Sequence, residues 1–313
     1  MGPLRSPPTR HAVSRFGTGT CVALNDVMSR NTIQLGGLRI DRLTQHAALE
    51  VIASLVAAQR GGFVVTPNLD HVAIAKRDAH LRAAYAAAAL SLADGQPLVC
   101  CSHLLGTPLP ERVAGADLLA PLFARAETEG WRVFLLGGQE DVSRRAKCIL
   151  RARHPRLRVV GRDASHWSPR SNAAPEDEPT VRVVRRARPD VVIVAYGCPK
   201  QERWMHRHAA QLGSAVCFGL GGSLDFYVGA VRRAPVWMSR CGVEWMYRLA
   251  QEPRRMAVRY LWRDPQVVPS LVLDALAQRL GLGPAVSTRG NPRLMTLIPG
   301  SAPSRGNPLQ RSV

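Results

Sequence analysis

The chain has 313 residues, of which 46% are hydrophobic and 21% charged, a globular composition with enough length for one large or two modest domains. No apolar run approaches the roughly 18 residues that cross a bilayer, and prolines and arginines occupy the N-terminal positions where a signal peptide needs an apolar core. The net charge of +19 comes almost wholly from arginine and predicts an anionic partner: a nucleic acid, a phospholipid surface or a phosphorylated substrate.

The predicted elements begin after a flexible N-terminal extension, residues 1–32, in which Met28 is an alternative start. Helices and strands then alternate, with a polar, Pro-rich insert over 167–180. They are a helix over 44–60, a strand over 61–68, a helix over 69–89, a strand over 90–95, a helix over 117–130, a strand over 131–138, a helix over 140–155, a strand over 157–163, a helix over 181–189, a strand, turn and helix over 190–208, and a last strand within 214–229. This alternation predicts a catalytic α/β domain over 33–230, with a mainly parallel, Rossmann-like sheet and helices on both faces.

Polar residues follow several predicted strands, at 66–68, 94–95, 137–138 and 197–201. Ligands of parallel sheets bind beyond the carboxyl ends of the strands, so these groups are expected to converge on one crevice. Asp94, followed at once by Gly95, is either a turn-former bonded to its own backbone or a base at the mouth of a site.

Two glycine-rich turns, "LLGGQEDV" (135–142) and "GLGGS" (219–223), fit either tight turns or phosphate cradles. Neither is a G-x-G-x-x-G or Walker motif, which argues against a dehydrogenase or a P-loop enzyme. No Asp-x-Asp pair stands at a strand end, so no metal or cofactor is expected, and arginines would meet the charge of a bound diphosphate.

Seven cysteines are scattered without metal-ligand spacing, so neither disulfides nor structural zinc is expected. The adjacent Cys100 and Cys101 lie in an apolar run and are expected to be buried.

The segment 231–265 forms a basic, aromatic appendage with eight arginines, broken at Pro253. Its aromatic residues fit packing onto the domain, contact with a bilayer interface or stacking on single-stranded nucleic acid. One more helix is expected over 270–281, within a mostly disordered tail over 266–313.

Several motifs in order resemble the WecG/TagA/CpsF family of bacterial glycosyltransferases, family 26. They are "TPNLDHVAIAKRD" (66–78), "DGQPLV" (94–99), "LPERVAGADLL" (109–119), "VFLLGG" (133–138), "YGCPKQERWM" (196–205), "GGSLDFYVGAVRRAP" (221–235) and "GVEWMYRLAQEPRRM" (242–256). Cys198 departs from the family pattern, in which a small Ala or Ser is more usual.

The resemblance implies an inverting, metal-independent enzyme that moves a hexose or N-acetylhexosamine-type sugar from a UDP-sugar to a polyprenyl-diphosphate-linked sugar. Asp94 would be the general base, and Gln201 would orient the sugar. The implied substrate-binding residues are Thr66, Asn68, Arg112, Gly137, Gly138 and Gly197. The arginines implied to meet the membrane or the acceptor diphosphate are Arg232, Arg233, Arg240, Arg248, Arg254 and Arg255.

The resemblance places the protein at the inner face of the cytoplasmic membrane, as a peripheral enzyme of cell-surface or exopolysaccharide assembly. A basic nucleic-acid-binding protein and a non-catalytic nucleotide-binding regulator are the alternatives. The first would bind DNA or RNA in a salt-sensitive way without responding to UDP, and the second would bind UDP-sugars without consuming them. The family motifs favour the enzyme and a partnership without nucleic acid.

Overall fold

The computed structural model describes residues 32–167 and 178–282, and within these ranges the side chains of Glu178, Val236, Arg240 and Arg255 are not described. Residues 1–31 of the expected N-terminal extension, most of the Pro-rich insert and the end of the tail therefore lie outside the described residues, whereas Thr32 begins β1.

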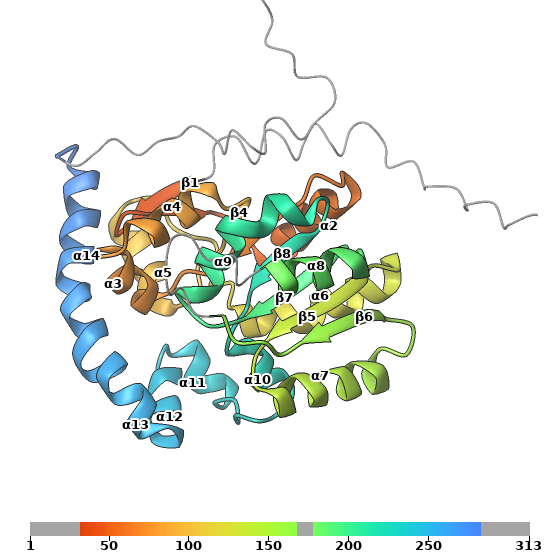
Figure 1. Ribbon diagram of the computed structural model, residues 1–313. Coiled ribbons are helices and arrows are strands. Elements are labelled where there is room, and N and C mark those ends of the chain that lie inside the picture. Colours follow the sequence, from red (N-terminus) through yellow and green to blue (C-terminus); the bar gives the residue numbers. More distant parts are fainter. Residues whose placement is uncertain (1–31, 168–177, 283–313) are drawn as a thin grey trace, which may run out of the picture.

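A six-stranded, fully parallel sheet forms the centre of the molecule, in the order β4-β3-β8-β7-β5-β6 (Figure 1). Its strands are β3 (Gly62–Val65), β4 (Leu90–Ser91), β5 (Arg132–Gly137), β6 (Arg158–Asp163), β7 (Val191–Ala195) and β8 (Val216–Gly219). A separate antiparallel hairpin consists of β1 (Thr32–Leu35) and β2 (Leu38–Asp41). The parallel sheet confirms the predicted fold class.

Successive residues of the central strands point to opposite faces of the sheet, and both faces are buried. In β7, Val192 and Val194 join one hydrophobic cluster, and Val191 and Ile193 join the other. This is why the strand is a continuous apolar run, without the alternation of a half-exposed strand.

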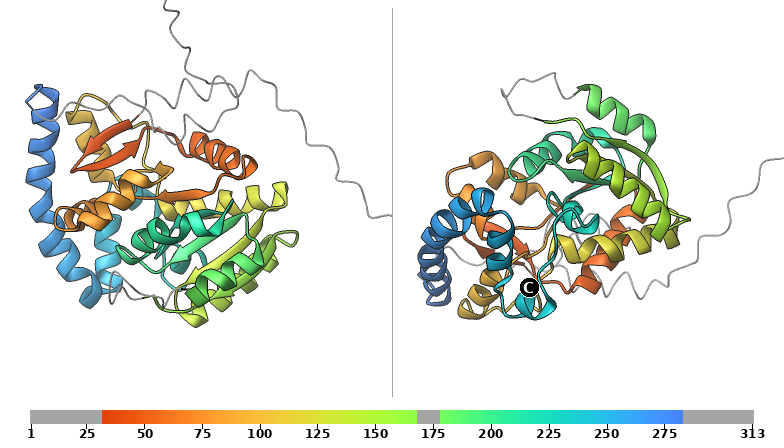
Figure 2. Two further views of the ribbon diagram at one scale, coloured as in Figure 1. Left: turned by 45° about the horizontal axis from the view of Figure 1, so that its top comes forward. Right: turned by 90° about the horizontal axis from the view of Figure 1, so that it is seen from below.

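Helices cover both faces (Figure 2). One cluster includes residues of α3 (Leu69–Ala75), α4 (Ala79–Ala87), α5 (Gln96–Leu104), α8 (Glu178–Ala187) and α9 (Lys200–His208). The other includes residues of α2 (Gln45–Ala57), α6 (Gly115–Glu129), α7 (Glu140–Arg153) and α10 (Ser223–Tyr227). The short 3-10 helix η2 (Ala209–Leu212) follows α9.

Three local predictions are corrected. The helix expected over 69–89 is interrupted, because Asp78 adopts an extended conformation and its side chain caps α4 by accepting from Leu81 N–H at 3.0 Å. The strand expected over 90–95 pairs only at Leu90 and Ser91. Cys101 is buried as expected, but Cys100 is exposed, because neighbouring residues of the helix α5 face different directions.

The C-terminal segment is mostly helical in its described part, with non-helical stretches at 231–235 and 241–243. It contains α11 (Val236–Arg240), α12 (Glu244–Gln251), α13 (Pro253–Ala257), the π-helical segment η3 (Val258–Arg263) and α14 (Asp264–Arg279). The helix α12 ends before Pro253, where a break is expected.

The start of the expected tail is corrected. From residue 266 the chain continues as α14 to Arg279, because Val267, Leu271 and Ala275 are buried against the domain. The N–H of Gly36, in the hairpin turn, also donates to Asp274 Oδ2 at 3.1 Å. In Figure 1 this helix runs along one side of the molecule.

Candidate active site

A cavity of about 890 Å³ opens beyond the carboxyl ends of β3, β4, β7 and β8. Thr66 follows β3, Asp94 follows β4 and Gly197 follows β7 in this lining. The chain continues from β3 to the neighbouring edge strand β4, but from β5 to β6 at the other edge, so the direction of the connections reverses between β3 and β5. Open α/β sheets bind ligands near such a reversal, and the cavity lies there.

The cavity brings together most of the residues predicted from the motifs. Those that line it are Thr66, Asn68, Asp94, Arg112, Gly197, Gln201, Arg233 and Arg248. Gly137 and Gly138 are not among its lining residues. Gly137 has φ +80° and lies so close to Tyr196 that a Cβ atom would come within 2.7 Å of its ring, while Gly138 N–H donates to Ala195 O at 3.0 Å. These contacts favour the tight-turn interpretation of this diglycine.

Asp94 is half-buried in the cavity wall, and the backbone fixes its position. Its N–H donates to Pro67 O at 2.8 Å, which ties the loop after β4 to the loop after β3. Burial raises the pKa of Asp94 to about 6, although Arg112 nearby lowers it in part, and the carboxylate of Glu244 raises it further. Near neutral pH this carboxyl group is ionised and has the basicity of a general base.

Asn68 faces the same cavity but also caps a helix. Its Oδ1 accepts from His71 N–H at 3.2 Å at the start of α3. Its amide N–H₂ group therefore remains the group that can bind a ligand.

Gln201 connects the two turns that follow β7 and β8. Its Oε1 accepts from Gly197 N–H at 3.2 Å and from Gly221 N–H at 3.0 Å, and its Nε2 donates to Glu202 Oε1 at 2.8 Å. The side chain is 3% exposed. Since both acceptor directions of Oε1 are used, only the second amide hydrogen is available to orient a sugar.

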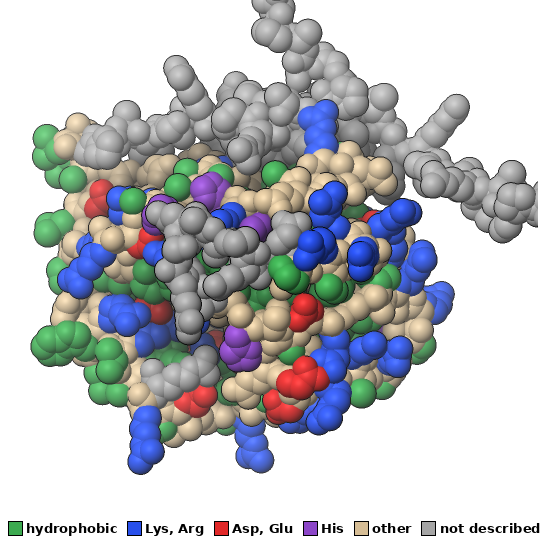
Figure 3. All heavy atoms as spheres, in the orientation of Figure 1, with side chains coloured by type: hydrophobic (Ala, Val, Ile, Leu, Met, Phe, Trp, Pro, Cys, Tyr) green, Lys and Arg blue, Asp and Glu red, His purple; other side chains and the backbone are tan. Residues whose placement is uncertain are grey.

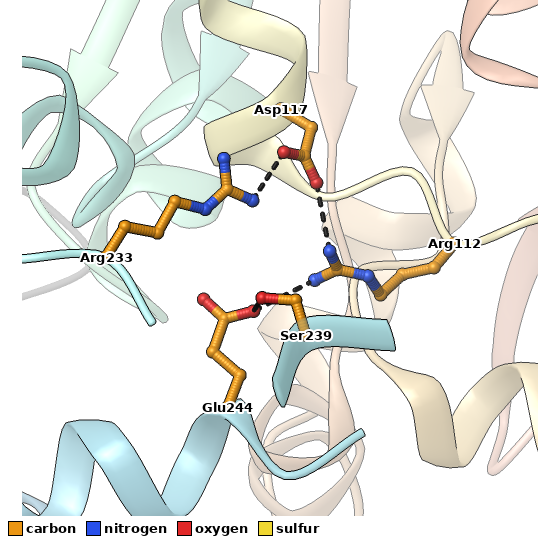
Figure 4. A network of polar contacts seen from close by, with 5 residues as sticks. All are labelled: Arg112, Asp117, Arg233, Ser239 and Glu244. Carbon is orange, nitrogen blue, oxygen red and sulfur yellow. Dashed lines mark hydrogen bonds and ion pairs between the residues drawn. The ribbon is translucent and has the colours of Figure 1, made fainter. Parts of the chain in front are cut away.

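Arg112 lies in a network that joins the α/β domain to the C-terminal segment (Figure 4). Its Nη2 is 3.0 Å from Asp117 Oδ2, and its Nη1 is 3.5 Å from Glu244 Oε2. Ser239 Oγ donates to the same Glu244 oxygen at 2.9 Å, and Arg233 pairs with Asp117. Both arginines can thus exchange a carboxylate for an incoming anion.

The C-terminal segment supplies one wall of the cavity. Arg259 and Arg263 line it and pair with Asp70 of α3, Arg263 Nη1 lying 2.8 Å from Asp70 Oδ1. These two arginines were not among the predicted site residues. Their spacing of four residues, which places both on one helical face, was the available signal.

Of the remaining predicted arginines, Arg232 and Arg254 are exposed and lie outside the cavity lining. The side chains of Arg240 and Arg255 are outside the described part of the structure.

The fold and the site define a class of protein: a doubly wound α/β protein with a carboxyl group of raised pKa and several arginines around a cavity at the strand ends. A sequence model described as "Glycosyl transferase WecG/TagA/CpsF family" matches residues 33–281. The chain belongs to this family and is a glycosyltransferase.

Three curated relatives share one name, N-acetylglucosaminyldiphosphoundecaprenol N-acetyl-beta-D-mannosaminyltransferase. The protein from Bacillus subtilis (strain 168) is 30% identical over 239 residues, which cover 76% of this chain and 85% of the relative. The protein from Staphylococcus aureus (strain MW2) is 31% identical, covering 72% and 86%, and that from Bacillus spizizenii (strain ATCC 23059 / NRRL B-14472 / W23) is 33% identical, covering 69% and 79%. Among the described residues, no helix has the length and apolar character needed to span a membrane.

Proposed function

We propose that the protein transfers an N-acetylhexosamine-type sugar from a UDP-sugar to a polyprenyl-diphosphate-linked N-acetylglucosamine in cell-surface polymer assembly. The names of the relatives, which specify an N-acetylmannosaminyl group and this acceptor, support the substrate class. The observation that carries the proposal is the position of Asp94, a carboxyl group with a raised pKa that lines the same cavity as Arg112.

The proposed reaction is a single in-line displacement. Asp94 accepts the proton of the acceptor hydroxyl, and the hydroxyl oxygen forms a bond to the anomeric carbon of the donor. The bond between that carbon and the β-phosphate oxygen breaks on the opposite side, so UDP leaves with the bonding electrons and the anomeric centre inverts. General-base catalysis contributes typically about 10²–10⁴-fold to such a step.

The negative charge that develops on UDP is met by arginines in this mechanism, without a metal ion in the transfer step. Arg112, Arg233 and Arg248 line the cavity together with Arg259 and Arg263. Guanidinium groups bind phosphate oxygens through paired, charge-assisted hydrogen bonds, which strengthen as charge accumulates on the leaving group.

The C-terminal segment is proposed to hold the enzyme peripherally at the inner face of the cytoplasmic membrane, where its acceptor is anchored. Trp237, Leu261 and Trp262 are 62%, 60% and 70% exposed, and Arg232 and Arg254 are exposed near them in the sequence. Basic side chains are also spread over the face seen in Figure 3. Exposed aromatic and basic side chains within one mostly helical segment of the chain suit an anionic bilayer interface.

The direct test is to incubate the full chain with a panel of UDP-sugars and a short-chain polyprenyl-diphosphate-N-acetylglucosamine, and to measure products by mass spectrometry. The proposal predicts that UDP is released and that the acceptor gains the mass of one N-acetylhexosamine residue. Binding of UDP-sugar without consumption of any donor would instead indicate a regulator. Salt-sensitive binding of DNA or RNA that ignores UDP would indicate a nucleic-acid-binding protein.

A further inference from the structure

Three side chains with metal-binding atoms meet in the cavity wall beside Gln201. His71 comes from α3, Cys198 from the turn after β7, and Glu202 from α9. One ligand atom from each lies within 4.8 Å of the other two, and within the described residues this is the group of its kind that could hold a metal ion. The proposed sugar transfer uses none of the three.

Glu202 is an unusual carboxyl group because it is completely buried and incompletely bonded. Its Oε1 accepts from Gln201, whereas Oε2 has no hydrogen-bond partner among the described residues. The thiol of Cys198 is hydrogen-bonded to this carboxyl group, and burial raises the pKa of Glu202 to about 7 although the hydrogen bonds from Gln201 and Cys198 lower it in part. A buried carboxylate without a full set of partners is costly and is stabilised by a proton or a cation.

His71 is arranged as metal-binding histidines are. Its ring is buried, and Nδ1 lies 2.7 Å from the hydroxyl of Tyr85. Burial, together with the nearby charge of Arg259, lowers the pKa of His71 to about 3, so the imidazole is neutral and keeps a lone pair. In metal sites the second ring nitrogen is commonly held by such an outer partner, which fixes the orientation of the ring.

We propose that His71, Cys198 and Glu202 bind one thiophilic divalent cation of the zinc class, with a fourth coordination position open to the cavity. A nitrogen, a sulfur and an oxygen ligand with one open position match the preferences of Zn²⁺, whereas the thiol disfavours Mg²⁺ and Ca²⁺. His71 and Cys198 line the cavity, so the open position faces the substrate side. With bonds of about 2.0–2.3 Å, tetrahedral ligand atoms stand roughly 3.3–3.8 Å apart, so the side chains need to close by about 1 Å.

Binding of the cation joins α3 to α9 and to the turn that carries Gly197. The Cys198 thiol and any protonated Glu202 carboxyl lose their protons to the solvent when the cation binds, so its affinity increases with pH. Because the cation binds the folded chain at a preformed cluster, it also raises the thermal midpoint of unfolding.

The test uses the full chain, stripped with a chelator and titrated with Co²⁺ and then with Zn²⁺, without donor or acceptor. We expect one equivalent of Co²⁺ to give thiolate-to-cobalt charge-transfer absorption, which Zn²⁺ abolishes and a large excess of Mg²⁺ does not. Cys198→Ser should remove this absorption and weaken Zn²⁺ binding by at least ~10–100-fold. Mutation of a residue that only hydrogen-bonds a metal ligand already lowers metal affinity by this amount. The matched control is Cys241→Ser, which removes an exposed thiol and should leave both measurements unchanged.

A second variant distinguishes the loss of a metal ligand from the loss of the folded structure. Glu202→Gln keeps the shape of the side chain but removes its charge, and should weaken Zn²⁺ binding while retaining the sulfur-to-cobalt absorption. The proposal is overturned if the stripped wild-type chain takes up no Zn²⁺ at micromolar concentrations, or if Cys198→Ser keeps the charge-transfer absorption. Since the readout is metal binding alone, either result is independent of whether the chain transfers a sugar.

Discussion

Arg112 Nη1 lies 3.5 Å from Glu244 Oε2, and this contact joins the loop between α5 and α6 to α12 of the C-terminal segment. Both side chains are about one-fifth exposed, so the pair is partly shielded from solvent and accessible from the cavity. A diphosphate that binds Arg112 must compete with Glu244. Substrate binding and the position of α12 are therefore expected to be coupled.

Substitution of the two partners should change UDP affinity in opposite directions. Arg112→Ala removes hydrogen bonds to a charged ligand, each worth about 1.5–3 kcal/mol, so UDP affinity should fall by roughly tenfold to a hundredfold. Glu244→Gln removes the competing charge and should increase the affinity. Isothermal titration of UDP measures both, with Arg125→Ala as a control because that arginine pairs with Glu50 and Glu129 outside the cavity. Equal affinity in all four proteins would contradict a role of Arg112 in diphosphate binding.

The activity should depend on pH through Asp94. Its pKa of about 6 means that kcat/KM falls about tenfold per pH unit below pH 6 and reaches a plateau above it, because only the carboxylate can accept a proton. Glu244→Gln should move this limb to lower pH, since Glu244 raises the pKa of Asp94. Burial also raises the pKa of Asp264 in the same cavity to about 6, so Asp264→Asn serves as the control and should retain the limb.

The same shift has a consequence for stability. In the folded state the pKa of Asp94 is above its ordinary value of 3.8, so ionisation of this carboxyl group is less favourable there than in the unfolded chain. The protonated Asp94 carboxyl group therefore favours the folded state at low pH, and this contribution to the free energy of unfolding is lost as the pH rises from about 4 to 6. Denaturant unfolding across this range should show a steeper fall for the wild type than for Asp94→Asn.

Gln201 is expected to act mainly by positioning the turns after β7 and β8. Gln201→Ala leaves the N–H groups of the half-buried Gly197 and Gly221 without their acceptor, at a cost of about 1 kcal/mol each, the lower end for an unpaired polar group. The thermal midpoint should fall by several degrees. Gln201→Glu keeps an acceptor oxygen for the two N–H groups but replaces the donor to Glu202 Oε1 with a second buried carboxyl group, so it should not regain the lost stability. A Gln201→Ala protein that unfolds like the wild type would contradict this role.

The membrane proposal can be tested without removing the C-terminal segment, because α14 packs on the domain and a truncation would expose its core. Arg232→Ala combined with Arg254→Ala should weaken binding to anionic vesicles by about thirtyfold, from about 1 kcal/mol for each basic residue near the surface. Arg185→Ala combined with Arg186→Ala, on α8, is the matched control of equal charge. If both double variants lose the same affinity, general charge rather than the C-terminal segment attracts the vesicles.

The sequence predicted the parallel sheet because its strands are buried on both faces and therefore consist of continuous apolar runs, as in Val191–Ala195. It also predicted that Thr66, Asp94 and Gly197 converge, since the ends of parallel strands meet at one edge. The pairing of Arg259 and Arg263 with Asp70 was not predicted, because it depends on how the C-terminal segment folds back on α3.

Two other features depend on three-dimensional packing and left little signal in the sequence. The group of His71, Cys198 and Glu202 spans two distant parts of the chain, so no metal-ligand spacing appears. Gly137 and Gly138 form a recognisable strand–turn–helix pattern, but only the contact with Tyr196 distinguishes a packed turn from a phosphate cradle.

The central claim, that Asp94 is the base of a sugar transfer, is tested most directly by comparing the turnover of the wild type with that of Asp94→Asn, using the donor found in the screen. The amide cannot accept the proton, so kcat should fall at least about a hundredfold, while UDP binding and the thermal midpoint remain those of a folded protein. Asp141→Asn, which alters an exposed acid on α7 outside the cavity, should keep full turnover. Turnover by Asp94→Asn within a few fold of the wild type would contradict the account.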